Sequence, residues 1–287
     1  MAIIEAPEET PARTFPAPRR RPRGPIIWVR AHIIPILGWL ALLYLFLPIF
    51  VVVVFSFNAP DGRYNYRFEH FSTAAWTNLC GPAGLCDSLK YSLTLGLFAT
   101  AGSVLLGTLM AFSMSRYRFR GRTPLNLLIF LPMATPEVVM GSSLLTLFLN
   151  LKLPLGFVTI LIAHIMFCLS FVVVTVKARL AGLDPRLEQA AADLYANERS
   201  AFWRITFPLV LPGIVAAALL AFSLSFDDFI ITSFNSGQAV TFPMFVWGAS
   251  QRGAPPQVNV VGSLMFLVAL SVVLGGQIRS MRKKSTT

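Results

Sequence analysis

The sequence LEQAAADLY, residues 187–195, lies between two hydrophobic spans in the second half of the chain and looks unsuited to lipid. Ala, Leu, Glu and Gln are good helix formers, so we expect a short exposed helix here. A turn and a second helix carrying Phe202, Trp203 and Ile205 should follow. The adjacent Ala190 and Ala191 leave a nearly flat, apolar surface flanked by charge. Such a surface suits the docking of another protein, although an amphipathic connector between two membrane spans fits the composition equally well.

The rest of the chain predicts an all-α membrane protein. Of its 287 residues, 55% are hydrophobic and 13% are charged, a balance typical of a multispan protein. A helix needs about 20 apolar residues to cross a bilayer, and lipid offers no partner for free backbone polar groups. Six segments are therefore predicted to be transmembrane helices: Ile33–Phe57, Ser88–Met114, Leu125–Leu149, Leu155–Val176, Leu209–Phe234 and Val258–Ile278.

The distribution of Lys and Arg predicts that both termini are cytoplasmic. In that orientation the cytoplasmic segments hold nineteen of the 24 basic residues. The net charge of +11 is then a topology signal and an attraction to anionic lipid, so we expect no nucleic acid as a partner. We expect a basic, proline-rich tail at 1–32, a six-span domain at 33–280 with a cytoplasmic loop at about 178–208, and a basic tail at 281–287.

Cysteine and histidine positions allow further predictions. Cys80 and Cys86 lie in the longest predicted outer loop, on the oxidising side of the membrane, so a disulfide is favoured over two free thiols. Cys168 lies inside a span and is expected to be a small apolar filler. His164, also inside a span, is expected to pack against another helix rather than act as a ligand.

Motifs that would make the chain an enzyme are absent from the sequence. Gly102 and Gly107 have the spacing of a phosphate-binding loop, but Thr108 follows directly without a lysine. The sequence also lacks H-E-x-x-H and C-x-x-C, and its three histidines are scattered. We therefore expect no catalytic residue, no metal site and no cofactor bound by this chain.

The loop spacing resembles the signature of permease subunits of binding-protein-dependent ABC importers: E-A-A, three residues, Gly, nine residues, Ile, one residue, Leu-Pro. Here Gln189-Ala190-Ala191 takes the first triplet, Tyr195 the Gly position, and Phe207-Pro208 the end. The resemblance spans all six hydrophobic segments. It implies the type I ABC importer permease fold and a coupling loop that docks on a cytoplasmic ATPase. The residues it assigns to this loop are Glu188, Gln189, Ala190, Ala191, Asp193, Tyr195, Phe202, Ile205 and Pro208.

Tyr195 is the strongest departure from that signature. The Gly of the family ends the first helix in a left-handed turn, where a Cβ costs about 1 kcal/mol. The sequence leaves open whether Tyr195 preserves this turn or whether Asn197 takes the left-handed position. The other departures are milder: Gln189 replaces Glu beside Glu188, and Phe207 replaces Leu.

A second resemblance concerns the substrate. The stretch SFDD at 225–228, PEVV at 136–139 and PPQVN at 255–259 are similar to the second permease of the spermidine/putrescine subfamily. Acids in a span are costly and tend to face a path. At about 1.5 Å per residue, Glu137 lies about 18 Å in from Leu125, near the midplane, and Asp227 and Asp228 lie toward the outer mouth. Acids at two depths suit a di- or tri-cation moving inward.

Each of these residues also has a structural interpretation. Asp227 and Asp228 can cap a helix end at the headgroup level, and Glu137 can form a hydrogen bond where Pro132 and Pro136 distort the helix. Ammonium groups are attracted to aromatic faces, although most Phe in a membrane helix faces lipid or another helix. The aromatic residues expected beside the acids are Phe226, Phe229 and Trp247.

These features predict a permease subunit of a bacterial ABC importer for polyamines, located in the cell membrane. ATP and Mg²⁺ would bind a partner ATPase dimer. The other expected partners are a second homologous permease, an extracytoplasmic substrate-binding protein, the polyamine and membrane lipid. One alternative is the same machine for a sugar, phosphate ester or amino-acid derivative. Another is an ion-coupled secondary transporter, which needs no ATPase dock. The acids within spans disfavour a scaffold without transport.

Overall fold

The computed structural model describes residues 25–117, 119–184 and 186–284. The residues up to Val51 and those from Val52 onward form two compact units, which are described separately. In the described ranges, five helices are long and apolar enough to cross a membrane, and a bent pair of shorter helices gives a sixth span if it counts as one. Within these same ranges, the regular secondary structure is helical apart from a short antiparallel pair, β1 (Asn58–Ala59) and β2 (His70–Phe71).

Helix α1 (Pro25–Phe55) is the predicted first span. It begins eight residues before the predicted boundary at Ile33, so the end of the expected tail is helical. Pro25 suits the first helical position, where its missing N–H group would have had no partner within the helix. Large apolar side chains between Ile33 and Phe50 are exposed, as a lipid-facing surface requires. The remainder of the expected tail, 1–24, lies outside the described residues.

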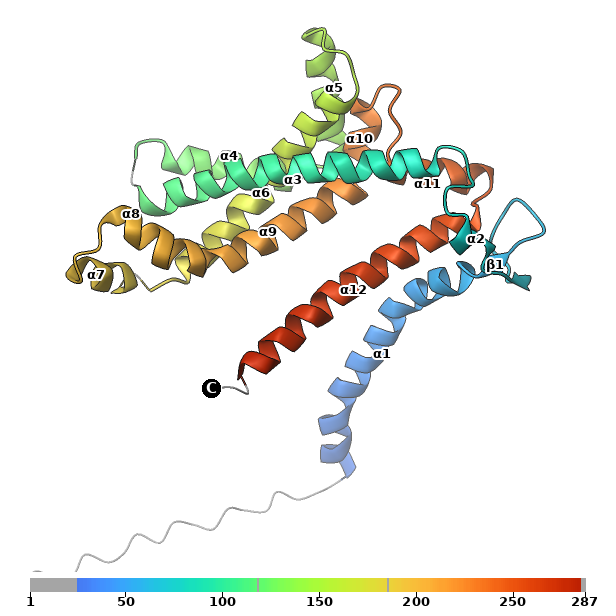
Figure 1. Ribbon diagram of the computed structural model, residues 1–287, viewed down its shortest axis with the longest axis horizontal. Coiled ribbons are helices and arrows are strands. Elements are labelled where there is room, and N and C mark those ends of the chain that lie inside the picture. Colours follow the sequence, from blue (N-terminus) through green and yellow to red (C-terminus); the bar gives the residue numbers. More distant parts are fainter. Residues whose placement is uncertain (1–24, 118, 185, 285–287) are drawn as a thin grey trace, which may run out of the picture. The chain divides into compact units, whose positions relative to one another are not determined.

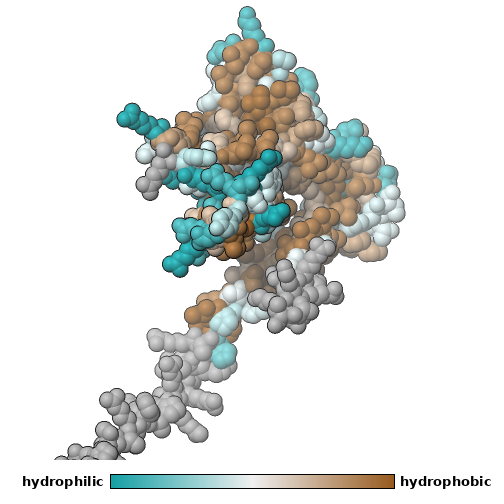
Figure 2. All heavy atoms as spheres, turned by 60° about the vertical axis from the view of Figure 1, so that its left-hand side comes forward, coloured by the Kyte–Doolittle hydropathy of each residue, from teal (hydrophilic) through white to brown (hydrophobic). Residues whose placement is uncertain are grey.

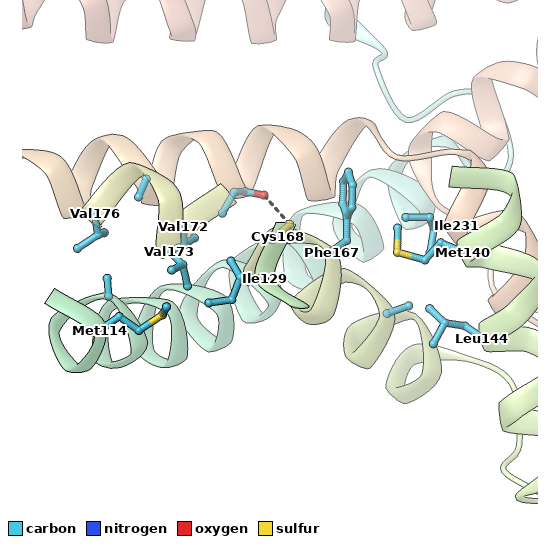
Figure 3. Packing of buried hydrophobic residues seen from close by; sticks show 14 of the residues in the cluster. Met114, Ile129, Met140, Leu144, Phe167, Cys168, Val172, Val173, Val176 and Ile231 are labelled. Atoms are coloured by element: carbon cyan, nitrogen blue, oxygen red, sulfur yellow. Dashed lines mark hydrogen bonds between the residues drawn. The ribbon is translucent and has the colours of Figure 1, made fainter. Parts of the chain in front are cut away.

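Three long helices form the core of the second unit (Figure 1): α3 (Leu85–Arg116), α6 (Phe157–Ala181) and α9 (Phe207–Asp227). Each packs against the other two. Figure 3 shows Met114, Val172 and Val176 within the buried apolar cluster. Gly107 permits the close approach of α3 to α6, because a Cβ there would lie 2.7 Å from Cγ1 of Val172.

The predicted third span is two helices rather than one. α4 (Arg122–Ala134) and α5 (Glu137–Asn150) meet at a bend of 107°. The break falls at Thr135 and Pro136, whose backbones are extended, because proline disfavours helical geometry in the residue before it. The continuous helix expected over 125–149 was therefore wrong, and so was the depth of Glu137 calculated from it.

The fifth span also differs from its prediction. Helix α8 (Glu198–Ala201), the π-helical turn η1 (Phe202–Thr206) and α9 form one continuous rod, so the second helix of the loop runs into the span. The rod ends at Asp227 rather than at Phe234. A separate short helix, α10 (Ile230–Asn235), follows the break.

The remaining elements complete the second unit. α12 (Pro256–Lys284) contains the predicted sixth span, and it also includes most of the expected C-terminal tail. The shorter helices are α2 (Ala74–Thr77), α7 (Arg186–Asp193) and α11 (Phe242–Arg252). Figure 2 turns the end of the unit that carries α7 and α8 toward the viewer, and hydrophilic side chains gather there between apolar flanks.

Candidate functional site

The loop at 182–206 folds into the two helices that its sequence predicts. α7 begins after Asp184, whose side chain accepts a hydrogen bond from the N–H of Arg186 at 2.9 Å. α8 begins at the cap residue Asn197, whose side chain accepts a hydrogen bond from the N–H of Ser200 at 2.8 Å. Each cap satisfies a backbone donor that a helix start leaves unpaired. The loop is therefore ordered by its own local sequence.

Tyr195 occupies the left-handed turn between α7 and α8, with a φ of 60°. The N–H of Ala196 bonds to the carbonyl of Ala191 at 3.0 Å, and the N–H of Tyr195 to the carbonyl of Ala192 at 2.9 Å. This pair of bonds is the Schellman motif, in which Gly is the usual residue at the position of Tyr195. The alternative that Asn197 takes the left-handed position was wrong, because Asn197 is extended.

The loop presents a mixed apolar and charged surface to its surroundings. The side chain of Tyr195 is 99% exposed and that of Leu194 is 81% exposed, so together they form an apolar tip. The two alanines do not form the expected flat surface together. Ala191 is only 6% exposed, whereas Ala190 is exposed. The other residues of the expected coupling surface that are exposed are Glu188, Gln189, Asp193 and Pro208, and those that are partly buried are Phe202 and Ile205.

Glu188 also ties the loop to the core of the unit. Its Oε1 atom forms an ion pair with Arg116 at the end of α3 and accepts a hydrogen bond from Thr206 in η1. The guanidinium carbon of Arg116 lies 5.8 Å from the ring centre of Phe202. Sequence reasoning missed Arg116 and Thr206, because neither lies near Glu188 in the chain. α7, η1 and α3 are thus joined by one polar cluster.

The two consecutive acids at the end of α9 have different roles in the structure. Asp228 is 8% exposed, and its carboxylate accepts hydrogen bonds from the N–H and hydroxyl of Thr232, both at 2.8 Å, and from the N–H of Ile231 at 3.3 Å. It therefore caps α10, which is the structural interpretation of this residue rather than the expected position in a path. Asp227 is exposed.

Glu137 lies close to Asp227 even though ninety residues separate them. Glu137 is the first residue of α5, after the bend, and is exposed. α5 packs against α10, which begins three residues after Asp227, and the amide group of Asn235 on α10 donates to the carbonyl of Gly141 on α5. Two breaks in membrane helices, one at Pro136 and one at Asp228, thus bring two exposed acids to one region of the unit.

The expected aromatic residues, like the acids, differ in whether they are exposed or packed inside the unit. The rings of Phe229 and Trp247 lie 5.4 Å apart, and Trp247 is 58% exposed. Phe226 instead packs into an internal apolar cluster with Leu85 and Phe242. The aromatic surface available to a solute is therefore the pair Phe229–Trp247.

The outer loop contains the expected disulfide, between Cys80 and Cys86, whose Cα atoms are 5.3 Å apart. The bridge ties the end of the loop to the first turn of α3, because Cys86 is the second residue of that helix. Beside it, a cavity of about 800 Å³ lies between the start of α3 and one face of α11. Asp87, Tyr91 and Arg252 are among the residues that line it.

Comparison with known proteins gives close relatives along most of the chain. It is 36% identical over 236 residues to the spermidine/putrescine transport system permease protein PotC of Escherichia coli (strain K12), covering 82% of this chain and 89% of that protein. It is 35% identical over 238 residues to the putrescine transport system permease protein PotI of the same organism, covering 80% and 84%.

A solved structure has the same fold at low sequence identity. It is a bacterial alginate ABC transporter in complex with an alginate pentasaccharide-bound periplasmic protein, with a TM-score of 0.62 and 16% identity. The match covers 89% of this chain and 94% of that one. The predicted fold class, that of a type I ABC importer permease, is confirmed.

A family model adds to this agreement. The model described as "Binding-protein-dependent transport system inner membrane component" matches residues 103–279. That range runs from the middle of α3 through the loop, the broken spans and most of α12. The chain therefore belongs to the binding-protein-dependent transport system inner membrane components.

Proposed function

We propose that this chain is the permease subunit of an ABC importer through which polyamines, such as spermidine and putrescine, enter the cytoplasm. The observation that carries this proposal is its similarity, over more than four fifths of its length, to a permease named for spermidine and putrescine. A polyamine is a flexible cation with two or more ammonium groups.

Exposed acids and aromatic rings support a cationic substrate. Asp227 and Glu137 place exposed carboxyl groups at the two helix breaks. Charged groups within a membrane protein are costly and tend to face a path, where they interact with the passing ion. Phe229 lies two residues after Asp227 in the chain, and its ring and that of Trp247 offer faces that attract ammonium groups. An anionic phosphate ester would be repelled by these carboxylates.

The driving force of the proposed transport comes from other subunits. An ATPase dimer would bind ATP and Mg²⁺ and would dock on the coupling loop, where Ala190, Leu194 and Tyr195 are exposed. A second, homologous permease would form the other wall of the path. An extracytoplasmic binding protein would deliver the polyamine. The chain itself catalyses no reaction.

A solute panel tests the substrate class. The complex of this chain with its second permease, ATPase and binding protein would be reconstituted in lipid, and ATP hydrolysis measured with each solute. We expect stimulation by spermidine or putrescine and no stimulation by a sugar, a phosphate ester or a neutral amino-acid derivative. Failure of every polyamine to stimulate hydrolysis would contradict the proposal. Solute uptake driven by an imposed ion gradient without ATP would favour a secondary transporter instead.

A further inference from the structure

A buried polar network joins three helices beside the proposed substrate path. His164 is the eighth of the 25 residues of α6 and is 1% exposed. Its Nδ1 atom lies 2.7 Å from the hydroxyl of Ser225 on α9, and its Nε2 atom lies 2.9 Å from the hydroxyl of Thr232 on α10. Nε2 also lies 3.3 Å from a carboxylate oxygen of Asp228. The imidazole therefore contacts both sides of the break between α9 and α10.

Hydrogen-bond geometry fixes which nitrogen is the donor. The hydroxyl of Thr232 has one proton, and it is donated to Asp228 at 2.8 Å. The same oxygen can therefore only accept from His164, so Nε2 carries a proton. Nδ1 contacts Ser225, which can donate or accept. The Nε2–H group thus supports the carboxylate of Asp228 both directly and through Thr232.

The far end of α10 is also held by polar contacts. The carbonyl of Asn235 accepts a hydrogen bond from the hydroxyl of Thr159 on α6 at 2.8 Å. The amide group of Asn235 donates to the carbonyl of Gly141 on α5 at 3.3 Å. Gly141 permits this contact, because a Cβ there would lie 2.8 Å from the ring of Phe234. Figure 3 shows Met140 of α5 beside Ile231 of α10. α10 thus connects α6 to the helix that begins with Glu137.

We propose that His164 is a positioning residue for the transported cation, acting through Asp228 and α10 on the spacing of Asp227 and Glu137. This inference rests on the proposed function. Asp227 is joined to Asp228 by the peptide bond at the end of α9. Holding Asp228 in place therefore also restricts the position of Asp227. Glu137 begins α5, which packs on α10. The imidazole of His164 therefore stabilises Asp228 and α10, and the positions of both exposed acids depend on these two.

Apolar packing alone would not require this arrangement. Burying a histidine, a carboxylate and two hydroxyls among apolar helices is costly unless every group is paired, and an apolar cluster of the same volume is often as stable. What the polar network adds is a defined direction for each bond. That property matters where two charges must keep a set separation to match a flexible polycation.

The matched variants His164→Gln and His164→Asn test the proposal in the reconstituted complex. The Gln amide can place an N–H donor where Nε2 stands, whereas the shorter Asn amide reaches only the Nδ1 side. Assembly is first verified by co-purification of the ATPase in equal ratio. We expect His164→Asn to raise the spermidine concentration for half-maximal stimulation of ATP hydrolysis about ten-fold, and His164→Gln about three-fold or less.

A double-mutant cycle separates positioning from general support. If His164 acts on the cation through Asp227, His164→Asn should change the half-maximal concentration less than about two-fold in a chain that already carries Asp227→Asn. Equal effects in the two backgrounds, or equal effects of the Asn and Gln variants, would overturn the proposal. If the complex with His164→Asn does not assemble, Thr232→Val replaces it in the double-mutant cycle. This variant removes only the hydroxyl between His164 and Asp228. No stimulation of the wild type by any polyamine would overturn the proposed function itself.

Discussion

Asp227 and Asp228 are consecutive in the chain and have opposite environments. The side chain of Asp228 turns inward and caps α10, whereas that of Asp227 is exposed at the last residue of α9. The adjacent pair therefore consists of one structural acid, Asp228, and one acid that is available to a solute, Asp227. This division explains why the chain breaks between α9 and α10 at this position.

Replacing the two acids should separate stability from transport. Asp228→Asn removes the charge that accepts two backbone bonds, a hydroxyl bond and the contact with His164. Hydrogen bonds to charged groups contribute roughly 1.5–3 kcal/mol, so we expect a lower unfolding temperature of the purified complex. Asp227→Asn, the matched control one residue earlier, should unfold at the wild-type temperature. Equal unfolding temperatures for all three proteins would contradict the capping role of Asp228.

The alanine pair of the loop should respond differently at its two positions. Ala190→Asp adds a charge to an exposed surface, so the loop should fold normally and resist trypsin as in the wild type. The variant should nevertheless fail to retain the ATPase on purification, because the charge would be buried without a partner in the dock. Ala191→Asp places the charge inside the loop, so trypsin should also cleave faster at Arg186 or Arg199. Normal ATPase retention by Ala190→Asp would exclude this surface from the dock.

Tyr195 should tolerate replacement by glycine. Its φ of 60° costs about 1 kcal/mol for a residue with a Cβ, and Gly removes that cost. We expect Tyr195→Gly to assemble as well as the wild type or slightly better. Tyr195→Ala is the control, because it loses the ring and keeps the Cβ. Loss of assembly in both variants would show that the ring packs against the ATPase.

The outer cysteines should be protected from reagents until they are reduced. A membrane-impermeant thiol reagent applied to intact cells or right-side-out vesicles should label Cys80 and Cys86 only after treatment with a reductant. Cys168 is buried in α6 and should stay unlabelled, so a Cys168→Ala chain serves as the control. Labelling of the outer pair without a reductant would contradict the disulfide.

Hydropathy predicts where the spans are and does not predict where they break. Average hydropathy is similar on both sides of Pro136, and Pro132 lies inside α4 without ending it. At the break after Asp227, the carboxylate of Asp228 finds donors three and four residues later in α10 and a further partner in α6. The local part agrees with the capping interpretation of the sequence, whereas the partner in α6 lies in no local pattern. The left-handed turn was located by family spacing, but only the structure decided between Tyr195 and Asn197.

Long-range polar partners are the part of the site that the sequence did not reveal. Arg116 joins Glu188 across 72 positions, and His164 joins Asp228 across 64 positions. An ionisable residue within a span is a signal for a buried network, but His164 was expected only to pack against another helix. Its partners could not be chosen, because helix packing rather than spacing along the chain brings them together.

An exposed acid of this chain should attract a polycation along its path. One charge pair at 4 Å is worth up to about 4 kcal/mol at an effective dielectric of 20, before desolvation is subtracted. A net effect of about 1–2 kcal/mol would slow uptake roughly ten-fold. Glu137→Gln should act in the same direction, because Glu137 is also exposed.

The most direct test is ATP-dependent uptake of labelled spermidine and putrescine by proteoliposomes that hold the complete complex. The wild type should accumulate both solutes. Asp227→Asn should slow spermidine uptake about ten-fold and putrescine uptake by a smaller factor, because the tri-cation loses more attraction than the di-cation. Uptake of both solutes at the wild-type rate by a chain carrying Asp227→Asn and Glu137→Gln together would contradict the account.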